Sequence, residues 1–150
     1  MKTISHHLYV AAPAARVWEA ITQAEGVKAL YFGSTLVTTF EPGAPYRYEG
    51  PDGKGNVVVQ VEGEVLSARV GKELVVTHRA GPVWRTGPKV FQSRVAYRLE
   101  DVGFATKVSL VQDEIEEGDP GYAHNLEGWA VFLSSLKSFV ETGRALPVPM

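Results

Sequence analysis

Residues Asp119–Gly143 read DPGYAHNLEGWAVFLSSLKSFVETG, the longest helical pattern in the chain. Asp119 can cap a helix, Pro120 suits its first position, and Gly143 can end it. Apolar residues recur at steps of three and four, which places them on one face. They are Tyr122, Leu126, Trp129, Leu133, Leu136 and Val140, widened by Phe132 and Phe139. We therefore predict one amphipathic helix of about 23 residues, or ~35 Å.

Most of the chain before this helix alternates between apolar and polar residues, as strands do. We predict strands at 3–10, 35–40, 45–49, 57–69, 73–79, 90–100 and 104–114. Two short helices separate the first two strands: Pro13 opens one, and Val27, Leu30 and Tyr31 form the inner edge of the other. A sheet with one solvent-exposed face and one buried face is typically antiparallel. The longest strands also span ~35 Å, so the fold class is α+β, a curved antiparallel sheet wrapped around a long C-terminal helix.

Composition and length narrow the range of functions. The chain has 150 residues, which fits one domain over 1–150 with a loose C-terminal tail at 144–150. The net charge is −2 and no basic stripe is visible, so we expect no nucleic acid partner. No apolar run approaches the ~20 residues of a membrane span. The absence of cysteine excludes disulfides and suits a cytoplasmic location.

If the apolar strand faces look toward the last helix, a set of mixed side chains meets between sheet and helix. Such a mixture is typical of a small-molecule site, where apolar groups surround a few polar ones. The alternative is a filled core in which the polar atoms satisfy one another. The candidate ligand-binding residues are Trp129, Phe132 and Leu133 for apolar contact, and Tyr97, His78 and Gln112 for orienting polar atoms, with Ser93 and Thr106 on the same face.

A binding protein is our first interpretation, and a cyclase- or hydrolase-like enzyme that uses His78 or Tyr97 is the second. The third is an interaction module that contacts a partner such as a chaperone through the outer sheet face. His78 is the one inward group that titrates near neutrality, although a lone histidine is more often structural. No nucleophile elbow, phosphate loop or dinucleotide fingerprint occurs, so no catalytic residue is assigned. His6, His7 and His124 show no metal-ligand spacing, and we expect neither a metal nor a cofactor.

Two further segments have open interpretations. Trp84 and Arg85 lie in a Gly/Pro-rich loop that could be a lid over the site or a surface loop with one anchored aromatic. The run 113–119 holds five carboxylates and lacks calcium-loop order, so we interpret it as a solvated segment near a helix N-terminus.

The order of strand, two short helices, six strands and long helix resembles the helix-grip fold of START-like domains, which include polyketide cyclases. Within that group, the chain resembles the family of the activator of heat-shock protein 90 ATPase. Val10–Thr22 is similar to that family's opening strand and helix, and 63–78 to its central hairpin. Thr106–Gln112 is similar to its last strand, and 128–143 to its closing helix. These are packing motifs, so they imply the fold more than an activity.

The sequence departs from the family pattern at two pocket positions. His78 stands where a Trp is usual, and Gln112 stands where a His is common. No ligand therefore carries over from the resemblance, and we expect a small, largely apolar molecule as partner. The eukaryotic co-chaperones have a further N-terminal domain for which this chain has no room, which argues against chaperone contact. Self-association into a homodimer through a strand edge or the tail stays open.

Overall fold

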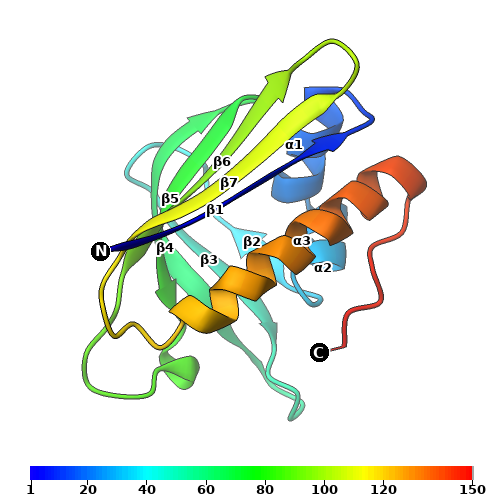
Figure 1. Cartoon of the computed structure of the whole chain (residues 1–150). Helices are drawn as coiled ribbons and strands as arrows, with labels where there is room; N and C mark the ends of the chain where they lie inside the picture. Colours follow the sequence, from blue (N-terminus) through cyan, green and yellow to red (C-terminus); the bar gives the residue numbers. More distant parts are fainter. Residues whose placement is uncertain (150) are drawn as a thin grey trace.

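The computed structural model describes residues 1–149, and Met150 lies outside the described residues. It confirms the α+β class (Figure 1). The strands are β1 (Lys2–Val10), β2 (Thr35–Val37), β3 (Pro45–Pro51), β4 (Val57–Arg69), β5 (Glu73–Ala80), β6 (Ser93–Asp101) and β7 (Thr106–Ile115). The helices are α1 (Ala14–Thr22), α2 (Ala24–Leu30) and α3 (Tyr122–Thr142), with a short 3-10 turn η1 (Pro82–Trp84).

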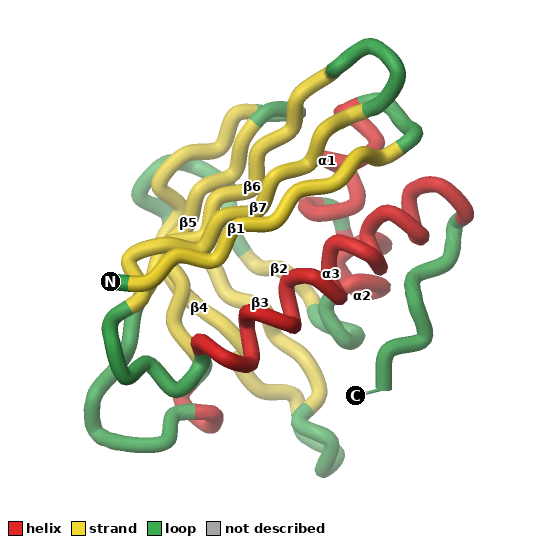
Figure 2. The backbone as a smooth tube through the Cα atoms, in the orientation of Figure 1, coloured by secondary structure: helices red, strands yellow, loops and turns green. Residues whose placement is uncertain are grey.

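All seven strands form one antiparallel sheet in the order β1-β7-β6-β5-β4-β3-β2. The first strand therefore pairs with the last one, which leaves β1 and β2 as the two edges. Figure 2 shows the sheet curving around one side of α3, with α1 and α2 at one end of the same concave face. This is the helix-grip arrangement that the order of elements predicts.

The concave faces of the strands supply most of the hydrophobic core. In β7 the inward side chains are Thr106, Val108, Leu110 and Gln112, and all four are almost completely buried. In β6 the inward side chains are Ser93, Val95, Tyr97 and Leu99, and they lie on the same concave face. These are the alternations that the sequence predicts, because period two fixes which residues share a face.

The two short helices pack tightly against each other because one position is glycine. A Cβ at Gly26 would collide with the backbone carbonyl of Ala20 in α1. A glycine is unfavourable in a helix interior, yet here it permits the close approach of α1 and α2. This contact carries Tyr31, the residue after α2, into the core.

The start of α3 is later than predicted, and Asp119 and Pro120 lie outside it. The helix begins at Tyr122, and the Asp119 carboxylate instead accepts a hydrogen bond from the Gly121 N–H at 2.8 Å. The C-terminal end is as predicted: Gly143 has φ of 85° and its N–H bonds to the Phe139 carbonyl.

The apolar stripe of α3 is only partly buried. The buried residues of α3 all lie from the middle of the helix onward, namely Phe132, Leu133, Ser135, Leu136 and Val140. Leu126 is 42% exposed, and the prediction that it packs inward is wrong. β1 does reach this turn of the helix, since Nε2 of His6 lies 3.0 Å from the Leu126 carbonyl oxygen, but the Leu126 side chain stays exposed.

Two strand boundaries also differ clearly from the predictions. β2 stops at Val37, and Phe40 has a φ of 63°, which is unusual for a residue other than glycine. β6 begins at Ser93 rather than at residue 90. Gly63 is needed because a Cβ there would strike the Thr77 carbonyl, while the register shift in the β4–β5 pair falls between Val65 and Ser67.

Candidate functional site

Trp129, in the first half of α3, connects the helix to a polar pair on the sheet. Its Nε1–H donates to Oε1 of Gln112 at 2.7 Å. The Gln112 amide nitrogen in turn donates to Oγ of Ser93 at 2.8 Å. Gln112 and Ser93 are both buried, on adjacent strands β7 and β6. The amide is thus satisfied on both sides, as a buried polar group requires.

Aromatic rings surround Trp129 on its other sides. Its ring centroid lies 5.6 Å from that of Phe132 and 6.2 Å from those of His78 and Tyr97, each in an edge-to-face arrangement. Five of the six candidate residues therefore meet at one place. Leu133, the sixth, is buried in the same hydrophobic core. Thr106 does not join them, because its hydroxyl donates to the Ala12 carbonyl at the other end of β7.

Two tyrosines that the sequence did not mark as site residues complete the cluster. The Tyr31 hydroxyl lies 2.9 Å from that of Tyr97, and the Tyr31 ring stacks on Tyr48 with centroids 4.5 Å apart. Tyr31 also contacts Phe132 at 4.9 Å between centroids. Alternation in β3 could have identified Tyr48 as inward, since Tyr46 and Tyr48 share one face.

The ionisable groups of this cluster stay uncharged near neutral pH. Burial lowers the pKa of His78 to about 4, although the nearby Asp119 carboxylate acts in the opposite direction. Burial likewise raises the pKa of Tyr48 to about 12, and it places the pKa of Tyr31 and Tyr97 well above the usual value. The site is therefore a neutral environment of rings, hydroxyls and one amide.

Side chains fill most of the space beneath α3. A small cavity of about 10 Å³ remains beside Tyr48, on the concave face of β2 to β5. That is about the room that one water needs. A larger hollow of about 290 Å³ lies at the surface, lined by Gly43, Pro45, Gly63, Glu64 and Arg79.

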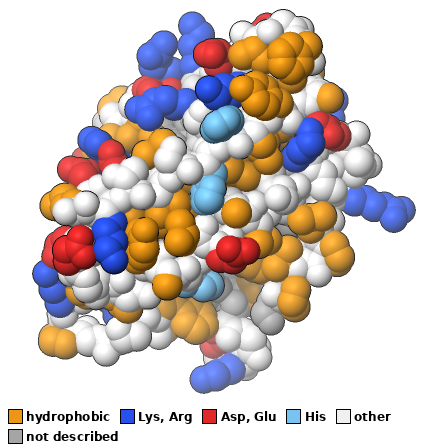
Figure 3. Space-filling model, viewed as in Figure 1, with side chains coloured by type: hydrophobic (Ala, Val, Ile, Leu, Met, Phe, Trp, Pro, Cys, Tyr) orange, Lys and Arg blue, Asp and Glu red, His pale blue; other side chains and the backbone are white. Residues whose placement is uncertain are grey.

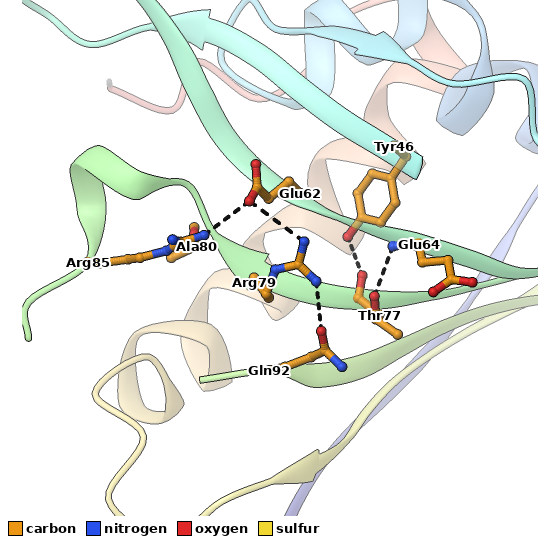
Figure 4. A network of polar contacts seen from close by, with 8 residues as sticks. All are labelled: Tyr46, Glu62, Glu64, Thr77, Arg79, Ala80, Arg85 and Gln92. Carbon is orange, nitrogen blue, oxygen red and sulfur yellow. Dashed lines mark hydrogen bonds and ion pairs between the residues drawn. The ribbon is translucent and has the colours of Figure 1, made fainter. Parts of the chain in front are cut away.

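The outer face of the sheet carries a separate polar network (Figure 4). Glu62 pairs with Arg79 at 3.7 Å and with Arg85 at 3.1 Å, and Arg79 also donates to Gln92. Trp84 donates its indole N–H to Gln60 at 2.7 Å. The loop that holds Trp84 and Arg85 thus lies on β4 as an anchored surface loop, and the lid interpretation is wrong.

The described residues contain no group of three or more His, Asp or Glu that could hold a metal ion. Within residues 1–149, no helix is both long and apolar enough to cross a membrane.

A curved antiparallel sheet closed over a long C-terminal helix, with an aromatic cluster between them, defines a helix-grip fold. The chain belongs to the family described as activator of Hsp90 ATPase homolog 1-like protein, whose model matches residues 11–141.

Solved structures share the fold at low sequence identity. The solution structure of the Aha1 dimer from Colwellia psychrerythraea is 22% identical with a TM-score of 0.74, and the match covers 97% of this chain and 100% of that one. DynU16, a putative protein in the dynemicin biosynthetic locus, is 24% identical with a TM-score of 0.74, over 97% of this chain and 49% of that one. ChR145 from Cytophaga hutchinsonii is 24% identical with a TM-score of 0.74, over 93% and 94%. Among curated proteins, no sequence match reaches significance.

Proposed function

We propose that the protein binds a small, uncharged, largely apolar molecule between the sheet and the first half of α3. The observation that carries this proposal is the cluster around Trp129, where rings from α3, β5 and β6 meet a hydrogen-bonded Gln112. Apolar walls with a few fixed polar groups are the common composition of small-ligand sites. A neutral His78 and protonated tyrosines favour an uncharged ligand over an ion.

Access requires movement, because side chains occupy most of this space. None of the residues in the first half of α3 is buried. Its movement would break the Trp129–Gln112 hydrogen bond and the contact between His6 Nε2 and the Leu126 carbonyl oxygen. The second half is anchored: Lys137 donates to the Tyr9 carbonyl, and Glu141 accepts the Ala11 N–H. We expect the ligand to displace Trp129 outward while Leu133, Leu136 and the rest of the second half stay in place.

Native mass spectrometry of freshly purified protein tests this proposal, followed by titration with the neutral fluorophore N-phenyl-1-naphthylamine (NPN). We expect a retained small molecule, or saturable NPN fluorescence that competes with it. Protein that carries no small molecule and also takes up no NPN would contradict the proposal.

The half-buried His78 predicts a specific pH dependence of stability. Unfolded histidine binds a proton below a pH of about 6.5, whereas the folded pKa is about 4. The unfolded state therefore binds more protons between these values, and stability falls as the pH is lowered through this window. From pH 7 to pH 5, we expect the free energy of unfolding, measured with urea, to fall by about 1 kcal/mol more in the wild type than in His78→Phe. This figure is reduced from the full linkage value because His78 is partly exposed to solvent. His7→Asn, at an exposed position, should behave like the wild type, and equal losses in all three proteins would contradict this assignment.

The structure supports the enzyme interpretation less well. With its pKa at about 4, His78 is unprotonated at neutral pH and is a weak base. Its ring contacts Trp129, and within residues 1–149 no carboxylate forms a hydrogen bond with it. Binding without turnover is therefore the function that we propose.

We also propose that the chain forms a homodimer through the exposed surface beside edge strand β1, where Tyr9 and Phe104 lie. Tyr9 in β1 stacks on Phe104 in the β6–β7 turn with centroids 5.9 Å apart, and Phe104 is 80% exposed. Figure 3 shows hydrophobic side chains gathered at the top of this face, over that turn. The related Aha1 from Colwellia psychrerythraea was solved as a dimer. Chaperone contact is not part of this proposal.

Phe104→Ser tests the dimer. An exposed aromatic pair gains contact area only when a second surface covers it. We expect light scattering after size exclusion to give a dimer mass for the wild type and a monomer mass for the variant, with unchanged melting temperature. A monomeric wild type at 100-fold different loading concentrations would refute the proposal.

A further inference from the structure

The Trp129 indole fills a space whose walls are other aromatic rings. Its ring centroid lies 5.6 Å from that of Phe132 and 6.2 Å from those of His78 and Tyr97, and all three contacts are edge to face. The three rings belong to α3, β5 and β6, so helix and sheet both contribute walls. We call this space, bounded by the three rings and Gln112, the indole slot. Edge-to-face packing on several sides favours a flat ring as its occupant.

Gln112 presents an oxygen atom to the indole slot, and two hydrogen bonds fix that orientation. An indole N–H can only donate, so the Gln112 atom 2.7 Å from Nε1 of Trp129 is the acceptor Oε1. The amide nitrogen on the other side donates to Oγ of Ser93 at 2.8 Å. Gln112 is 2% exposed, so bulk water is not at hand to replace a lost partner. The occupant of the slot therefore has to supply a donor at this end.

A ligand that enters the indole slot has to take over the hydrogen bond that Trp129 gives up. Within residues 1–149, every buried side-chain nitrogen and oxygen already has a hydrogen-bond partner. Displacement of Trp129 leaves Gln112 Oε1 without its donor, and an unpaired buried acceptor is costly. Trp129 is itself partly exposed, whereas Phe132 and Tyr97 are buried. A molecule that enters from the solvent side can thus replace the indole while these two rings stay in place.

We propose that Trp129 occupies the place of the ligand, and that the preferred ligands are uncharged flat ring compounds with an N–H or O–H donor on the ring, such as indoles and phenols. This inference rests on the proposed function and adds a chemical class to it. The ring walls select the flat shape, and Gln112 Oε1 selects the donor. A ring with an acceptor at the same place points a lone pair at Oε1 and is disfavoured. Burial, which lowers the pKa of His78 to about 4, leaves the slot without a charged wall at neutral pH.

Indole and benzofuran test the inference by competition against NPN, because benzofuran has nearly the same shape with a ring oxygen in place of the N–H. One neutral hydrogen bond corresponds to about five-fold in affinity. We expect indole to bind the wild type at least about five-fold more tightly than benzofuran. Gln112→Met keeps a side chain of similar length without the amide, and it should abolish this preference. Gln92→Met, the same substitution on the exposed outer face, is the matched control and should keep the preference in full.

The indole N–H signal of Trp129 in ¹H–¹⁵N spectra reports the displacement directly. The chain has three tryptophans, and Trp129→Phe assigns this signal by removing it. Saturation of the wild type with unlabelled indole should move the Trp129 signal to the position of a solvent-exposed indole. The signals of Trp18 and Trp84 should stay in place. These wild-type measurements decide the inference even if Gln112→Met does not fold.

Equal binding of indole and benzofuran to the wild type would overturn the inference but leave the proposed function standing. The same holds for an indole preference that persists in folded Gln112→Met, and for a Trp129 signal that stays in place when indole is bound. Failure of NPN, indole and benzofuran to bind at millimolar concentration would refute the proposed function, and this inference with it.

Discussion

Trp129→Ala is expected to lower the free energy of unfolding by about 3 kcal/mol, at the lower end for a core tryptophan because the side chain is only partly buried. Two effects add. The substitution removes ring contacts to His78, Tyr97 and Phe132. It also deprives the buried Gln112 Oε1 of its donor, which costs more than the bond itself contributed.

Leu126→Ala is the matched control from the same half of α3. Its side chain is 42% exposed, and we expect a loss below about 1 kcal/mol. Trp129→Phe keeps an aromatic ring without the N–H, and should fall between the two. Urea unfolding measures all three variants. If Trp129→Ala unfolds at the same urea concentration as the wild type, then Trp129 does not hold α3 to the sheet.

Gly26→Ala should destabilise the protein by about 3 kcal/mol, the upper end for overpacking. The added methyl group would collide with backbone atoms of Ala20, which cannot rotate away as a side chain can. Relief requires α2 to move from α1, and this movement would displace Tyr31 from Tyr97. We therefore also expect Gly26→Ala to weaken NPN binding, since the tyrosine cluster depends on the position of α2.

Gly128→Ala is the internal comparison, because it is the same substitution in a helix with nothing near the new methyl group. Alanine is the better helix former, so we expect a gain of about 0.5–1 kcal/mol. The decisive result, in thermal or urea unfolding, is that Gly26→Ala lowers the free energy of unfolding while Gly128→Ala raises it. A stabilising Gly26→Ala would show that α1 and α2 are farther apart than described.

The fold was largely predictable because strand and helix periods are local properties. The alternation in β7 placed Gln112 inward, and the helical repeat placed Trp129 and Phe132 on one face, so these residues meet as predicted. Whether the polar atoms would satisfy one another was left open, and Gln112 does bond to both Trp129 and Ser93.

The parts that were missed depend on how elements dock. Tyr31 and Tyr97 are 66 residues apart, and their contact follows from the glycine-mediated packing of α2, which no local period encodes. Leu126 obeys the helical repeat, but its side chain stays exposed, and the repeat alone does not show which positions of the apolar face a neighbouring element covers. The start of α3 was predicted too early. Asp119 does not cap the helix, because its carboxylate accepts the Gly121 N–H in a turn just before it.

The central claim is that an uncharged molecule lies between α3 and the concave sheet, and intermolecular NOEs test it most directly. The measurement uses protein labelled with ¹³C and ¹⁵N together with unlabelled NPN. We predict NOEs from the naphthalene protons to the rings of Trp129, Phe132 and Tyr97. NOEs confined to outer-face residues such as Trp84 would contradict the account.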